Sequence, residues 1–86
     1  MQFEKSTRKN KKYMVLYNGK WIHFGDKNYS QIEDSTPLKL YKNLNHYDQE
    51  RRELYLKRAM AIKDKHGNLT YLSKESPNYY SIKYLW

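Results

Sequence analysis

The stretch Lys12–Asp26, KYMVLYNGKWIHFGD, reads as two short strands around one tight turn. Asn18-Gly19 is a strong hairpin signal, because a type I′ turn needs a positive φ at both central residues. We therefore predict a hairpin with strands Lys12–Tyr17 and Lys20–Phe24, ended by Gly25. A hairpin alone is marginally stable in water, so another element must pack on it.

Alternation of side chains along the second strand assigns its two faces. Ile22 and Phe24 are expected to point inward, which places His23 on the exposed face. His46 is expected to sit at a helix start and His66 in a turn. No spacing points to a Ser, His and Asp assembly, so no catalytic residue is predicted.

A helical period follows in Asn45–Asp64, NHYDQERRELYLKRAMAIKD. Asn45 or Asp48 can cap its start. At 100° per residue, Arg51 and Arg58 fall in the middle of an apolar stripe. The other members of that stripe are Tyr47, Leu54, Tyr55, Ala61 and Ile62.

Two arginines on a buried face require partners or must reach out to water. One interpretation pairs Arg51 and Arg58 with carboxylates such as Asp26, Asp48 or the terminal carboxylate of Trp86. The other makes them a fork for an anionic ligand, a phosphate in particular, with Tyr55 stacked between them. We favour the structural pairing.

The segment Ser76–Trp86, SPNYYSIKYLW, is too apolar to hang free. Ser76 before Pro77 suits a helix start, although an extended strand also fits the composition. A helical turn near Pro37–Leu44 and a turn or short strand at Leu69–Leu72 complete the expected elements. The predicted fold is α+β: one small domain with an N-terminal hairpin packed on one main helix and a docked aromatic C-terminal segment.

Positive charge is concentrated at the start of the chain. The net charge is +8 over 86 residues, and residues 1–20 hold six bases against one acid. We predict a loose basic arm over residues 1–11 and a compact domain over residues 12–86. Such an arm suits sequence-independent contact with phosphate backbones. The expected nucleic-acid-binding residues are Lys5, Arg8, Lys9, Lys11, Lys12, Lys20, Arg52 and Lys57.

Composition excludes several classes of site. The absence of cysteine excludes disulfides and thiolate metal sites. Three isolated glycines form no phosphate-binding loop, and neither a zinc-finger spacing nor a nucleophile elbow is present. We expect no cofactor, no metal, no membrane span and no secretion signal. The ten tyrosines are assigned mainly to the core, which a small domain without cysteine must fill with large side chains.

The ordered motifs His23–Asp26, His46–Arg58 and Ser76–Trp86 resemble a family of small, mostly uncharacterised proteins of nucleocytoplasmic large DNA viruses. Similar short proteins occur in tailed phages. The shared pattern is FGD, then HxDxxRRxxYxxRH, then an aromatic pair, Ser and a closing LW. One departure is Ala59, where many members have His. The matching positions are Gly25, Asp26, Asp48, Arg51, Tyr55, Arg58, Ser81, Leu85 and Trp86.

The resemblance implies a viral protein associated with the virion, or with the host cytoplasm and viral factory. Combined with the charge, it favours a non-enzymatic protein that binds nucleic acid without strong sequence preference. The alternative is a minor capsid or core protein that acts through other virion proteins, because Tyr, Trp and Arg are typical interface anchors. The oligomeric state is open, with a homodimer as one option. Asp26, Asp48, Arg51, Tyr55, Arg58 and Trp86 form the predicted structural or anion-binding cluster.

Overall fold

The computed structural model describes residues 1–86 and contains one antiparallel sheet and two α-helices. The strands are β1 (Phe3–Lys5), β2 (Lys11–Tyr17) and β3 (Lys20–Asp26), in the order β1-β2-β3. The helices are α1 (Gln49–Ala59) and α2 (Pro77–Tyr84). Short 3-10 turns span Lys42–Leu44 and Thr70–Leu72. The predicted α+β class is therefore confirmed.

The hairpin between β2 and β3 turns at Asn18 and Gly19, which have φ values of 49° and 74°. Tyr13 lies opposite Phe24 and Val15 opposite Ile22 in the antiparallel register. All four side chains are buried, so one face of the hairpin supplies four of the six residues of the hydrophobic core cluster. The period of two along each strand is the physical reason why they share a face.

The N-terminal residues are part of the sheet, which corrects the prediction of a loose arm over residues 1–11. Phe3 pairs with Val15 and Lys5 with Tyr13, so β1 forms the third strand. The Phe3 ring also packs edge-on against Tyr84 at a centroid distance of 4.8 Å. Because Phe3 contributes apolar surface to the core, this segment is docked rather than free.

The outer face of the sheet is covered at His23, so the expected exposure of this residue is wrong. Ser6 lies in the turn between β1 and β2, and its Oγ is 2.7 Å from Nδ1 of His23. The same oxygen accepts a hydrogen bond from the backbone N–H of Arg8. Both side chains are buried. Burial lowers the pKa of His23, with the nearby charges of Arg8 and Lys11 acting in the same direction.

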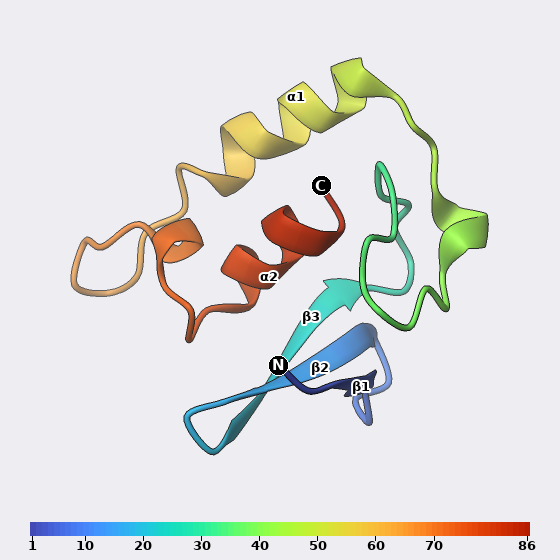
Figure 1. Ribbon diagram of the computed structural model, residues 1–86. Coiled ribbons are helices and arrows are strands. Elements are labelled where there is room, and N and C mark those ends of the chain that lie inside the picture. Colours follow the sequence, from blue (N-terminus) through green and yellow to red (C-terminus); the bar gives the residue numbers. More distant parts are fainter.

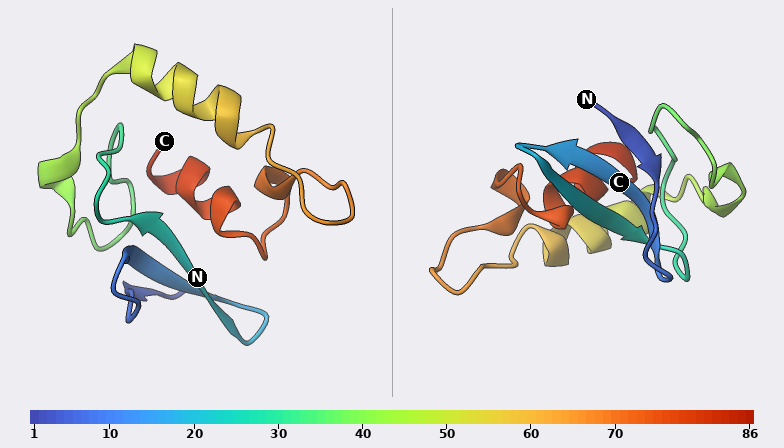
Figure 2. Two further views of the ribbon diagram at one scale, coloured as in Figure 1. Left: turned by 180° about the vertical axis from the view of Figure 1, so that it is seen from behind. Right: turned by 90° about the horizontal axis from the view of Figure 1, so that it is seen from below.

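The C-terminal segment forms a helix that lies between the sheet and α1 (Figure 1), and the left view of Figure 2 shows the same order from behind. The Ser76 hydroxyl caps α2 by accepting the N–H of Asn78 at 3.2 Å, and Pro77 occupies the first turn. Tyr80 and Leu85 complete the buried core with the hairpin residues. The element on the hairpin is therefore α2, whereas the expected main helix, α1, packs on α2.

The long connection between β3 and α1 is held by buried polar side chains. Asp34 accepts hydrogen bonds from the Tyr13 hydroxyl, from both donors of Thr36 and from the backbone N–H of Tyr41. The amide of Gln31 donates to the Tyr41 carbonyl at 2.8 Å. These contacts satisfy the backbone of a segment that has little regular structure.

No helix of this fold has both the length and the apolar character needed to cross a membrane.

Candidate functional site

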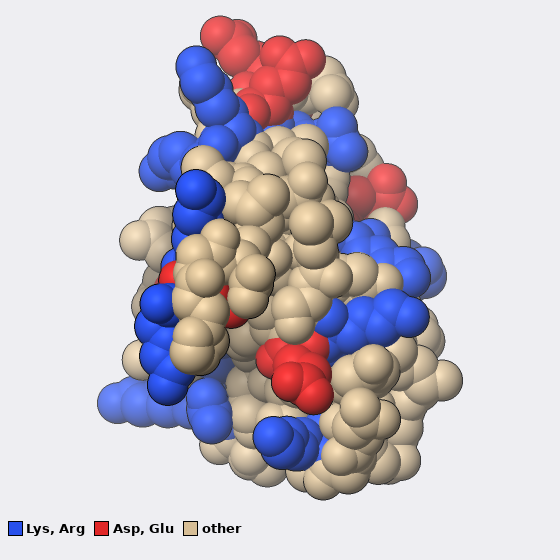
Figure 3. All heavy atoms as spheres, turned by 90° about the vertical axis from the view of Figure 1, so that its left-hand side faces the viewer, with Lys and Arg blue, Asp and Glu red and all other residues tan.

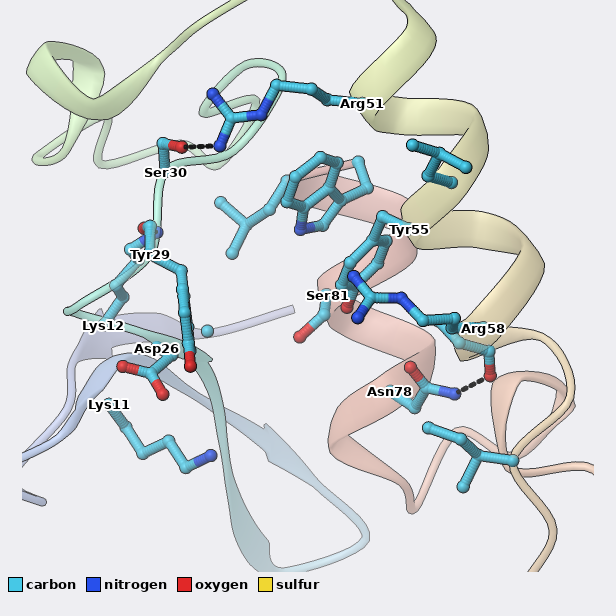
Figure 4. Close-up of a pocket in the computed structure, with 16 residues that line it drawn as sticks. Lys11, Lys12, Asp26, Tyr29, Ser30, Arg51, Tyr55, Arg58, Asn78 and Ser81 are labelled. Carbon is cyan, nitrogen blue, oxygen red and sulfur yellow. Dashed lines mark hydrogen bonds between the residues drawn. The ribbon is translucent and has the colours of Figure 1, made fainter.

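One cleft, of about 630 Å³, lies where the end of the hairpin faces the helices (Figure 4). Its first wall is formed by the hairpin end and the loop that follows, including Asp26 and Tyr29. Its second wall is α1 with the residues that follow it, and α2 with Leu85 and Trp86 forms the floor. Lys11, Arg51 and Arg58 bring positive charge to this cleft from two different elements.

Arg51 and Arg58 are exposed, so the predicted buried pairing of these residues is wrong. The inward face of α1 instead consists of Arg52, Tyr55, Leu56 and Ala59. This spacing of three and four residues is that of a single helix face. The predicted stripe was displaced because Tyr47, Ala61 and Ile62 lie outside the eleven-residue helix and do not follow its period.

Arg51 and Arg52 have the opposite roles to those predicted from the sequence. Arg51 donates from Nη2 to the Ser30 hydroxyl at 2.8 Å, which joins α1 to the loop across the cleft. Arg52, predicted as a nucleic-acid contact, is half-buried and donates from Nε to the main-chain oxygen of Trp86. Arg52 is therefore the arginine that anchors the C-terminal residue, and its Nε is already occupied.

Asp26 and Asp48, which were expected to pair with Arg51 and Arg58, accept backbone hydrogen bonds instead. Asp48 caps α1, with its Oδ1 accepting the N–H groups of Glu50 at 3.0 Å and Arg51 at 3.3 Å. Asp26 lies opposite Lys11 in the sheet register, and its Oδ1 accepts the N–H of Asn28 at 2.8 Å. Asp26 nevertheless faces the cleft (Figure 4). Both carboxylates are therefore engaged by backbone N–H groups and are not bonded to Arg51 or Arg58 side chains.

Tyr55 and Trp86 form a parallel stack, with ring centroids 4.1 Å apart and an interplanar angle of 10°. The His46 ring also lies near Trp86, with ring centroids 5.2 Å apart and an interplanar angle of 52°. Burial raises the pKa of Tyr55, while Ser81 and the positive charge of Arg58 act in the opposite direction. The stack forms the wall of the cleft next to Arg58. Tyr55 and Trp86 were both placed in the predicted cluster, but the prediction that Tyr55 stacks between Arg51 and Arg58 is wrong, because it stacks on Trp86.

His46 lies just before α1 and makes a local contact there. Its Nδ1 accepts the backbone N–H of Asp48 at 2.9 Å, as fits a residue at a helix start. Its Nε2 is buried without a partner, and burial lowers the pKa of the imidazole. The neutral ring is therefore the form that packs on Trp86.

The predicted nucleic-acid-binding residues divide by exposure. Most are open to solvent and therefore available to a phosphate backbone: Lys5, Arg8, Lys9, Lys20 and Lys57. Lys11 is half-buried on the rim of the cleft. Lys12 is only 1% exposed, which removes its ammonium group from the predicted set.

Lys12 is buried because its ammonium group joins the loop to the sheet. Nζ donates to the Tyr29 carbonyl at 2.8 Å and to Oε1 of Gln31. Burial lowers the pKa of Lys12 to about 8, although Asp34 and Asp26 favour its charged form. The burial of Lys12 was not predicted from the sequence, because this residue was counted among the bases expected to contact nucleic acid.

Because Lys12 is buried, we expect the free energy of unfolding to increase as the pH becomes alkaline. The unfolded chain binds the Lys12 proton up to a pKa near 10.5 and the folded chain only up to about 8. Stability therefore increases as the pH rises through 8. It declines above about 10, because ionisation of Tyr13 is delayed to about 12 in the folded state. We expect a gain of about 1 kcal/mol between pH 7.5 and 9.5 in urea unfolding.

The matched variant for this prediction is Lys12→Met, which keeps the length of the side chain and removes the titrating group. Its overall stability falls, but its free energy of unfolding should not rise between pH 7.5 and 9.5. An equal pH dependence in both proteins would contradict the assignment of the effect to Lys12.

The cleft also gathers the positions that carry the sequence resemblance. Every one of them except Asp48 lines it, including Gly25 of the hairpin and Ser81 of α2. Gly25 has a φ of 78°, and a Cβ atom there would lie 2.8 Å from Cδ1 of Leu85. Glycine is therefore required for the close approach of β3 to the end of α2.

Comparison with known proteins gives one partial match. Residues 1–32 match a family model described as "Family of unknown function (DUF5754)". The matched range covers the three strands and ends in the loop that follows β3. Neither the curated proteins nor the solved structures yielded a match to this chain.

Proposed function

We propose that this chain is a small, basic, non-enzymatic viral protein that binds nucleic acid through its phosphate backbone, with little sequence preference, inside the virion. The observation that carries the proposal is the exposure of Arg51 and Arg58 around a cleft that also holds Lys11. If Arg51 and Arg58 were buried and paired with carboxylates, their charges would not be available to a ligand. The viral context rests on the resemblance of the three motifs.

The distribution of charge supports contact with an extended polyanion. Figure 3 shows Lys and Arg side chains along two edges of one face, with fewer Asp and Glu side chains between them. Arg8 and Lys9 extend from the turn between β1 and β2, close in the chain to Lys11 at the cleft. A phosphate backbone neutralises such dispersed charges and releases counterions, which gives affinity without reading the bases.

Salt dependence tests the proposal. Binding to duplex and single-stranded DNA should weaken linearly on a logarithmic salt scale, with a slope of about −0.9 per duplex phosphate neutralised. The double variant Arg8→Gln/Lys9→Gln should make the slope shallower by about 1 to 2. Fluorescence anisotropy with labelled DNA measures both quantities.

A charge-conserving variant, Arg8→Lys/Lys9→Arg, is the control and should keep the slope of the parent protein. Absent binding, or binding that salt does not weaken, would refute the nucleic-acid proposal.

A second candidate is a structural role in the virion through protein contacts. The observation in its favour is the exposure of Leu38, Leu40 and Leu72 outside the cleft. A contiguous apolar patch is typical of a surface that a partner covers, and Leu38 and Leu40, two residues apart in one loop, would be part of it. This candidate predicts salt-insensitive association with virion proteins in cross-linking, and it would be preferred if the DNA titration fails.

A further inference from the structure

The cleft contains apolar side chains that a phosphate backbone alone would not contact. Tyr29 is 68% exposed on the hairpin side, whereas Leu54 and Ile62 are 59% and 52% exposed on the side of α1. Figure 4 shows Tyr29 on the wall opposite Tyr55 and Arg58. An aromatic ring and aliphatic side chains on facing walls are suited to the two faces of a flat, apolar ring.

The charges in the same cleft specify an anion. Four cationic side chains line it, of Lys11, Lys12, Arg51 and Arg58, against the single carboxylate of Asp26. Lys12 and Arg51 are held by their hydrogen bonds to Gln31 and Ser30. Arg58 is exposed and its guanidinium extends into the cleft (Figure 4). Arg58 and Lys11 are therefore the groups available to a phosphate.

From this combination we propose that the cleft binds one unpaired nucleotide, either free or within a single strand. The phosphate binds Arg58 and Lys11, the base lies between Tyr29 and Leu54, and Asp26 accepts a hydrogen bond from a sugar hydroxyl. The proposal deepens the nucleic-acid function and rests on it. The cleft volume of about 630 Å³ is within the range of small-molecule sites, about 300–1,000 Å³.

The geometry favours an unpaired nucleotide over a duplex. Bases of a duplex are stacked on their neighbours, so their faces cannot enter a cleft between Tyr29 and α1. Recognition through ring faces is tolerant of base identity, because every base has a π-face. The site therefore adds a preference for single strands to a protein that otherwise reads only charge.

The test uses the full chain with Trp21→Phe, so that Trp86 beside the cleft is the only tryptophan. The probes are adenosine 5′-monophosphate, adenosine, inorganic phosphate and a single-stranded hexanucleotide. We expect the monophosphate to change Trp86 fluorescence and to bind about tenfold more tightly than adenosine or phosphate. The hexanucleotide should compete for the same site; its failure to compete would leave free nucleotides as the ligand and overturn the strand-binding form.

Two pairs of variants assign the effect to the cleft. Arg58→Gln and Tyr29→Ala should each weaken the monophosphate about tenfold. Lys83→Gln removes a charge from an exposed side chain of α2 outside the cleft, and Tyr47→Ala removes an aromatic ring that is 66% exposed elsewhere. These two controls should bind as the parent does, and melting temperatures check that all four variants fold.

Several results would overturn the inference. These are equal binding of monophosphate and phosphate, equal effects of Arg58→Gln and Lys83→Gln, or displacement of the monophosphate by an acidic peptide more readily than by the hexanucleotide. Salt-dependent duplex binding with no response to the monophosphate would refute the nucleotide site and leave the proposed function standing. A response to the monophosphate without binding of any DNA would refute the proposed function and leave a site for free nucleotides.

Discussion

Asp34→Ala should be one of the most destabilising single substitutions in this protein. The carboxylate is 1% exposed and accepts hydrogen bonds from Tyr13, Thr36 and Tyr41. Its removal leaves the hydroxyl groups of Tyr13 and Thr36 and the backbone N–H groups of Thr36 and Tyr41 without this acceptor. Buried donors that lose an ionised acceptor are among the most destabilising changes. We expect a loss of about 3–4 kcal/mol, against a total of roughly 4–13 kcal/mol for a chain of this length.

A matched control is Asp64→Ala. Asp64 accepts the N–H groups of His66 at 2.8 Å and Asn68 at 3.0 Å, but in an exposed turn. Water can replace those bonds, so the loss in urea unfolding should be far smaller. Equal losses for the two variants would show that the buried hydrogen bonds of Asp34 stabilise the fold no more than the exposed ones of Asp64.

Acid unfolding of the parent protein should also report on Asp34. Burial alone would raise the pKa of this carboxyl, but the hydrogen bonds from Thr36, Tyr13 and the backbone together hold it below its ordinary value of 3.8. The resulting stability is present above pH 4 and is lost as the pH falls through the folded pKa. Asp34→Asn should lack this part of the acid dependence.

Gly25→Ala should destabilise the protein more than the same change at Gly19. Both glycines have positive φ, 78° and 74°, so alanine is strained at either position by about 1–2 kcal/mol. Only at Gly25 would the new methyl group meet other atoms, with Cδ1 of Leu85 at 2.8 Å and Cβ of Lys12 at 3.2 Å. We expect a loss of about 2–4 kcal/mol at Gly25 from strain and overpacking together.

Thermal unfolding of both variants measures the difference, and a double variant identifies its source. Leu85→Val shortens the side chain that blocks the methyl group, so Gly25→Ala should be less harmful in that background. A loss at Gly25 no larger than that at Gly19 would mean that β3 and the end of α2 separate without penalty.

The sequence predicts the local structure well where backbone chemistry dominates. The Asn18-Gly19 turn was predicted outright, whereas Asp48 was one of two candidate caps and a helix starting at Ser76-Pro77 was one of two options. All three rest on residues whose hydrogen bonds or φ preferences are satisfied locally. The class of fold followed from these signals. The order of the layers did not, because the choice between α1 and α2 as the partner of the sheet depends on packing between distant segments.

The candidate site illustrates the same limit. Five of the six residues grouped from the sequence line the cleft, namely Asp26, Arg51, Tyr55, Arg58 and Trp86, whereas Asp48 caps α1 instead. Their roles were misjudged because the helix period was measured over residues that lie outside α1. The network of Asp34 and Gln31 was missed entirely, since polar residues in an irregular loop have no period that would indicate burial.

The place of α2 between the sheet and α1 has a consequence for synthesis on the ribosome. The apolar face of the hairpin stays uncovered until Tyr80 and Leu85 pack on it, and these residues are translated long after Phe24. Until then the emerging chain exposes Tyr13, Val15 and Phe24 to solvent and to other chains. The nascent protein thus depends on a single late helix, and its exposure to aggregation ends when that helix leaves the exit tunnel.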